Sequence, residues 1–184
     1  MSTLTYIWQM ASDCPEELIV IHDERTVDPM SLRAANPVPN AASALFFHDG
    51  LKSDFVREAY IPNSALLPLV SVSAAREIGK LPGVYAQQLP ARVRCSDGEI
   101  PCVLLNPLKT VSAVDWAATK AVFISGTKHV RKFHSLQLLP NPLGGNSIAR
   151  LGEFSQFVLV TEAVKNVLTS SSLCEFDLPA NIKP

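Results

Sequence analysis

The stretch around residue 97 constrains the fold most, because it predicts a β-hairpin. Residues 91–95 alternate between apolar and polar, Asp97-Gly98 is a turn dipeptide, and residues 100–105 supply a returning strand. An Asp-Gly pair between two such runs favours a two-residue turn. That turn pairs residue 95 with residue 100 and residue 93 with residue 102. We therefore expect antiparallel sheet, with the thiols of Cys95 and Cys102 not directly opposed.

Two segments, residues 69–90 and 158–179, have the same order of features. Each has an apolar strand, a hydroxyl residue, a short run at helical spacing, a loop, a second strand and Leu-Pro. Ser73 and Thr161 are the predicted helix N-caps, since a hydroxyl there accepts a hydrogen bond from an unpaired backbone N–H. Either the unit is duplicated, or two ordinary β–α–β patterns look alike.

The rest of the chain predicts short elements joined by defined turns. Residues 28–44 form a loop with one short turn of helix, residues 52–60 a short helix, and residues 110–116 a strand. We expect an α+β fold with mostly antiparallel sheet and a few short helices, including two Ser/Thr-capped helices in a repeated strand–helix–strand unit. A length of 184 residues suits a single domain over residues 1–184.

Composition places the chain among soluble proteins. Residues 1–10 have no basic start and no long apolar core, so we expect no signal peptide. No stretch approaches the ~20 apolar residues that span a bilayer, so we expect no membrane partner and a cytoplasmic location. The four cysteines form no C-x-x-C pair and are expected to be free thiols.

Charge is distributed unevenly along a chain whose net charge is −1. This balance argues against a nucleic-acid partner, because phosphate binding needs a basic field. A basic stretch contains Lys128, His129, Arg131, Lys132 and His134. An acidic segment, residues 13–28, has one base, Arg25, among six acids. The candidate partner-binding residues are Asp13, Glu16, Glu17, Asp23, Glu24 and Asp28. Two ordinary solvated faces are the alternative.

Motifs of catalysis and cofactor binding are missing from the sequence. It contains no dinucleotide fingerprint, no phosphate-binding loop and no nucleophile elbow. Ser125 to Lys128 fits S-x-x-K, but the companion motifs are missing. A metal site built from His22, His48 and nearby acids stays open as an alternative. We therefore predict no catalytic residue, no cofactor and no bound metal.

Several spaced motifs resemble a family of bacterial immunity proteins from polymorphic toxin systems. They are Leu-Leu-Asn-Pro-Leu at 104–108, Val-Ser-Ala-Val-Asp at 111–115, Arg-Leu-Gly-Glu at 150–153, the apolar run and helix at 157–168, and the closing strand at 174–179. The family has a Leu-Asn and Val-Asp strand region, an arginine-containing strand before the last helix, and a final short strand. The resemblance covers residues 64–179, with Pro107 and Pro82-Gly83 as departures.

This resemblance implies a protein that binds a cognate toxin and performs no catalysis. Its partner is then the toxin itself, and interbacterial competition is its setting. Two other classes remain open, namely a small motif-free enzyme resembling a hydrolase, and a structural or assembly subunit.

Overall fold

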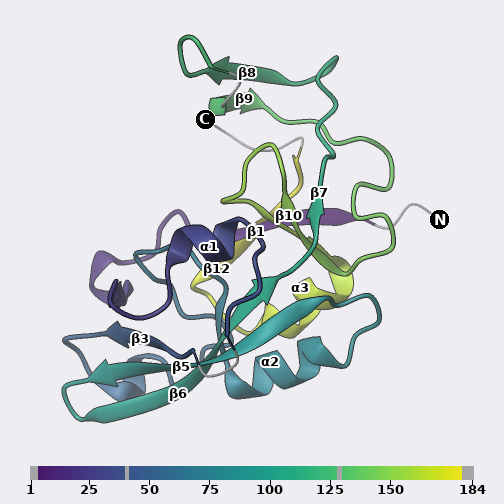
Figure 1. Ribbon diagram of the computed structural model, residues 1–184. Coiled ribbons are helices and arrows are strands. Elements are labelled where there is room, and N and C mark those ends of the chain that lie inside the picture. The colour runs from purple at the N-terminus through teal and green to yellow at the C-terminus, as the bar shows by residue number, and fades with distance from the viewer. Residues whose placement is uncertain (1–3, 40–41, 128–129, 180–184) are drawn as a thin grey trace.

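The computed structural model describes residues 4–39, 42–127 and 130–179. Its architecture is mixed α+β, with most elements in sheets and few helices (Figure 1). Two five-stranded sheets form the body, and a two-stranded ribbon stands at one end. Most strand pairs are antiparallel, and the parallel ones described are β3 with β5 (Ala44–Phe47, Ala86–Cys95) and β7 with β10 (Thr110–Val111, Ile148–Leu151).

The first sheet joins the beginning of the chain to its end. Its strand order is β12-β1-β11-β10-β7. The remaining strands of this sheet are β1 (Thr5–Met10), β11 (Val158–Thr161) and β12 (Cys174–Asp177). Strand β1 pairs antiparallel with both β11 and β12, so it lies between the two strands that flank helix α3 (Glu162–Leu168).

The second sheet is built around the predicted hairpin. Its order is β2-β3-β5-β6-β4. The strands not yet given are β2 (Ile21–His22), β4 (Leu69–Ser71) and β6 (Gly98–Pro107). Strand β6 pairs antiparallel with β4 and with β5. It thus separates the two strands that flank helix α2 (Val72–Gly79), and α2 contacts α3.

The register of the hairpin is shifted by two residues from the prediction. Cys95 pairs with Gly98 and Ala91 with Cys102, so Ser96 and Asp97 form the turn. A neighbouring loop sets this register, because the hydroxyl of Ser96 donates to the carbonyl of Gly50 at 2.8 Å. The Asp97 carboxylate likewise accepts from a backbone N–H of that loop. The shift keeps every side chain on its predicted face, and both thiols are free.

The predicted cap Ser73 is wrong by two residues. Helix α2 begins at Val72, and Ser71 is the N-cap, since its hydroxyl accepts from the Ala74 N–H at 3.2 Å. Strand β4 ends earlier than its apolar run suggests, which places Ser73 inside the helix. Thr161 occupies the N-cap position of α3 with extended backbone, yet its hydroxyl makes no capping hydrogen bond.

Two predicted elements are shorter in the structure. Residues 52–60 hold only the 3-10 turn η2 (Lys52–Asp54), because the following chain pairs with β4: Ile61 donates to the carbonyl of Leu69, and Ser71 to that of Ala59. This pairing overrides the helix propensity of the segment. Of residues 110–116, only Thr110–Val111 form a strand.

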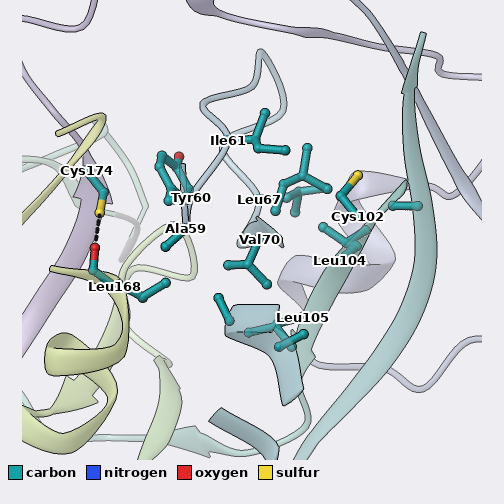
Figure 2. Packing of buried hydrophobic residues seen from close by; sticks show 14 of the residues in the cluster. Ala59, Tyr60, Ile61, Leu67, Val70, Cys102, Leu104, Leu105, Leu168 and Cys174 are labelled. Carbon is teal, nitrogen blue, oxygen red and sulfur yellow. Dashed lines mark hydrogen bonds between the residues drawn. The ribbon is translucent and has the colours of Figure 1, made fainter. Parts of the chain in front are cut away.

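The core occupies both faces of the first sheet. On β11, Val158 and Val160 point into the larger cluster between the sheets, whereas Leu159 points into a second cluster under the ribbon. Burial on both faces explains why this strand is continuously apolar. Figure 2 shows part of the larger cluster, where Val70 and Leu104 are fully buried. Each such side chain contributes about 1.5–3 kcal/mol.

Candidate functional site

The acidic segment begins in the exposed turn between β1 and β2 and continues past β2. Glu16 and Glu17 lie in the first turn of the 3-10 helix η1 (Glu16–Leu18). Together with Asp13 and Glu24 they are exposed, and within the described part of the chain the carboxylates of these four residues have no hydrogen-bonded or ion-paired partner. These four carboxylates are therefore available to an outside cation.

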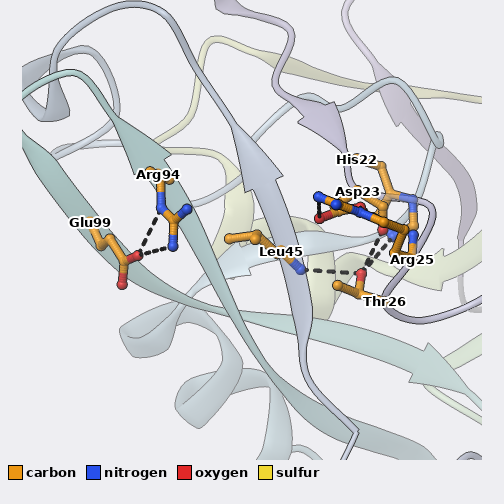
Figure 3. A network of polar contacts seen from close by, with 7 residues as sticks. All are labelled: His22, Asp23, Arg25, Thr26, Leu45, Arg94 and Glu99. Carbon is orange, nitrogen blue, oxygen red and sulfur yellow. Dashed lines mark hydrogen bonds and ion pairs between the residues drawn. The ribbon is translucent and has the colours of Figure 1, made fainter.

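Asp23 is already engaged inside the protein. Its carboxylate accepts two hydrogen bonds from the Arg25 guanidinium, both at 2.9 Å, and one from the Arg25 backbone N–H (Figure 3). These hydrogen bonds hold the pKa of Asp23 below its usual value. Asp23 is also buried, at 9% exposure. It therefore shapes the turn and presents little carboxylate surface to a partner.

Asp28 serves helix α1 (Pro29–Arg33) as its N-cap. Its carboxylate accepts from the backbone N–H of Met30 and from both N–H and hydroxyl of Ser31. The hydroxyl of Ser31 is the main cause of the lowered pKa of Asp28. Asp28 is exposed, so its charge contributes to the surface while its oxygens stabilise the helix.

Tertiary structure adds acids that the linear segment does not contain. A hollow of about 550 Å³ is lined by Glu16, Glu17, Asp49 and Asp54. A second hollow of about 470 Å³ is lined by Glu16 and Glu175. Glu16 belongs to both. No described residue lining either one is Lys or Arg. We call two sets of acids together the acidic surface: the exposed acids of the segment without partners, Asp13, Glu16, Glu17 and Glu24, and the further acids that line the two hollows, Asp49, Asp54 and Glu175.

Two of the acids near the second hollow are held together on β12. The Gln9 side-chain amide donates to Glu175 at 2.8 Å and to Asp177 at 3.0 Å. Glu175 also accepts from the backbone N–H and the hydroxyl of Ser12. Burial, and then the nearby charge of Glu175, raise the pKa of Asp177. No sequence signal marks this pair, because Gln9 lies on a strand 166 residues away from Glu175.

A histidine and a carboxylate pair beside the first hollow. Nε2 of His48 lies 2.9 Å from Oδ2 of Asp54, and this hydrogen bond is the main cause of the lowered pKa of Asp54. The imidazole also packs against the ring of Phe55. Among the residues lining the hollow there is no Ser, Thr, Cys, Tyr or Lys.

His22 is buried, and it lines a different hollow from His48. Its ring packs on Phe46, and burial lowers its pKa despite the nearby acids Asp23, Glu24 and Asp28. Within residues 4–39, 42–127 and 130–179, no three His, Cys, Asp or Glu side chains gather as metal ligands. The structure does not bring together the metal site considered from the sequence.

The other sequence candidates lie on the ribbon of β8 (Lys120–Phe123) and β9 (Val130–Ser135). Arg131, Lys132 and His134 are exposed on β9, while Lys128 and His129 lie outside the described residues. Ser125 lies in an exposed turn after β8, and the lysine of its S-x-x-K pattern is that same Lys128.

Comparisons with known protein families and with curated proteins find no match to this chain. No helix in the described part of the chain is long and apolar enough to cross a membrane.

Proposed function

We propose that this chain is a cytoplasmic immunity protein that neutralises a cognate bacterial toxin by direct binding, without catalysis. The resemblance of residues 64–179 to immunity proteins supports the class of function. The acidic surface supports the mode of binding. Interbacterial competition is the setting this proposal implies, and the partner is the toxin rather than a nucleic acid or a membrane.

One observation carries the binding mode, namely that carboxylates line two adjoining hollows and that no Lys or Arg is found among the described residues lining either one. Carboxylates without internal partners attract a basic protein and raise its association rate. Toxins that act on nucleic acids need basic active sites, since phosphates must be bound there. An acidic surface both steers such a toxin and blocks its site.

The first test is neutralisation in cells. A toxin gene is expected next to the gene for this chain, and co-expression of the chain should restore growth of cells that produce that toxin. Growth that stays inhibited at equal expression of both proteins would count against the proposal.

The second test locates the interface by association kinetics with the same toxin. Glu16→Lys and Glu24→Lys should each slow association about tenfold or more at low salt, and the salt dependence should flatten. Glu77→Lys is the matched control, because Glu77 is an exposed acid on α2 whose ion pair with Lys80 is a surface pair. Equal association rates for all three variants would show that the interface lies outside the acidic surface.

The enzyme alternative has one observation in its favour, the His48–Asp54 pair beside a 550 Å³ hollow. An oriented imidazole is a common general base. Turnover of an ester, phosphate or glycoside that is lost in His48→Gln, with folding intact, would favour this alternative over the binding function.

We further infer that residues 69–90 and 158–179 are two copies of one unit. In each, a strand runs into a helix and a second strand follows. A third strand, β6 or β1, lies antiparallel between the two. A circular permutant that begins between the units and still folds cooperatively would support the inference, and one that cannot fold would count against it.

A further inference from the structure

The second hollow is an apolar cleft with a negative rim. Its walls include the aromatic rings of Trp8, Tyr60 and Phe157, and Glu16 and Glu175 stand at its edge. Leu66 borders it with 42% of its surface exposed and with φ of 52°, which is a strained value for leucine. An apolar cleft with carboxylates at its rim fits apolar side chains that are accompanied by basic ones.

The ribbon and the turn that precedes it, which holds Trp116, carry such a set of side chains. Trp116 and Phe123 are 45% and 46% exposed, and their rings lie 5.7 Å apart. Val122 and Ile124 add further exposed apolar surface. Three basic side chains, Lys120, Arg131 and Lys132, are exposed on the same two strands. In Figure 1 the ribbon stands away from the two sheets. Exposed aromatic rings in contact with each other, as Trp116 and Phe123 are, indicate an interaction surface.

We propose that the cleft receives the Trp116–Phe123 ribbon of a second copy of the chain. Apolar area is then buried on both sides, and the basic side chains of the ribbon meet the rim acids. Both complementary surfaces belong to the same sequence. The inference does not depend on the proposed function.

The cleft and the ribbon lie close together on one molecule. Phe133, on the inner face of the ribbon, stacks on Phe157 with ring centroids 6.1 Å apart, and Phe157 lines the cleft. In two copies related by a two-fold axis, the ribbon of each copy enters the cleft of the other, and the two contacts together form one closed interface. Because Glu16 belongs also to the acidic surface, a bound toxin and a second copy exclude each other there.

Sedimentation equilibrium of the full chain tests the assembly. We expect a dimer that weakens as salt is added, because salt screens the rim contacts. Phe123→Ser and Lys132→Glu on the ribbon, and Glu16→Lys on the rim, should each raise the dimer dissociation constant about tenfold or more. Combining Lys132→Glu with Glu16→Lys in one chain should recover part of the loss.

Two matched variants control for exposure and charge. Val56→Ser removes an apolar side chain that is 73% exposed, and Glu77→Lys reverses an exposed acid on α2 that does not line the cleft. Both should leave the dissociation constant unchanged, and circular dichroism verifies that every variant is folded.

Cys14 gives an independent readout of the cleft. It lines the cleft and is partly exposed, whereas Cys95, Cys102 and Cys174 are buried. Its alkylation rate should fall as protein concentration rises, and should not fall in Phe123→Ser. A monomer at all concentrations, a larger assembly, or a Cys14 rate independent of concentration would overturn the proposal. If a toxin slows the alkylation of Cys14 but a higher protein concentration does not, the cleft belongs to the toxin instead of a second copy.

Discussion

Nε2 of His48 and Oδ2 of Asp54 lie 2.9 Å apart, and the same oxygen accepts the backbone N–H of Leu51. These two hydrogen bonds hold the loop between β3 and η2 in place beside the first hollow. Gly50 lies against this pair, and a Cβ at that position would clash with both side chains. The hydrogen bond between the buried imidazole and the partly exposed carboxylate therefore fixes the loop that carries Asp49 and Asp54 beside the first hollow.

Asp54→Asn should make folding stability less dependent on pH in the acidic range. The folded-state pKa of Asp54 is lowered, chiefly by the hydrogen bond from His48. A lowered carboxyl pKa stabilises the fold above the ordinary value of 3.8, and this stabilisation is lost as the pH falls through the folded-state pKa. Urea unfolding across the acidic range measures the difference. Parallel stability profiles for the two proteins would contradict the assignment.

His22 should destabilise the fold as the pH falls below neutrality. Burial lowers its folded-state pKa from 6.5, so the unfolded chain takes up the proton first. Stability is then lost from about that pH down to the folded-state pKa. His22→Gln should lose less stability than the native chain between about pH 7.5 and pH 5. His134→Gln, at an exposed position on β9, is the control for replacing a histidine by glutamine.

The two helix caps should respond differently to mutation. Ser71→Ala should cost about 1 kcal/mol of unfolding free energy, because it removes a capping hydrogen bond to Ala74. Thr161→Val should cost less than about 0.5 kcal/mol, since the buried hydroxyl of Thr161 has no partner to lose. Chemical denaturation measures both. A loss at Thr161 as large as that at Ser71 would mean that its hydroxyl does cap α3.

Arg150→Met should leave stability unchanged or raise it by about 1 kcal/mol. The guanidinium is fully buried and donates a hydrogen bond to the carbonyl of Ser155, while Nε and Nη2 have no partner among the residues that the structure describes. Burial, and then the charge of Arg33, lower the pKa of Arg150 to about 10. Replacing a buried charge that lacks a counter-ion by an apolar side chain of similar size removes a desolvation penalty. A loss of about 3 kcal/mol or more in chemical denaturation would show that Arg150 has a partner.

Local sequence determines which segments of this chain can form strands or helices. The hairpin of β5 and β6, the short helix within residues 28–44 and the helices after β4 and β11 follow from turn residues and periodicity. Local sequence also places acids in the exposed turn before β2. These features depend on residues within one or two turns of each other, so their patterns are visible along the chain.

Contacts between distant segments decided the rest. The hairpin register depends on the Gly50 loop, and the chain after η2 is extended because β4 offers it hydrogen bonds. The acidic surface was only partly predictable. Asp23 is paired with Arg25, whereas Glu175 reaches the cleft only because β12 pairs with β1. The sequence determined the charges and the local elements. Tertiary structure decided which charges remain free and which hollows they surround, because hydrogen bonding and burial depend on neighbours that no local pattern encodes.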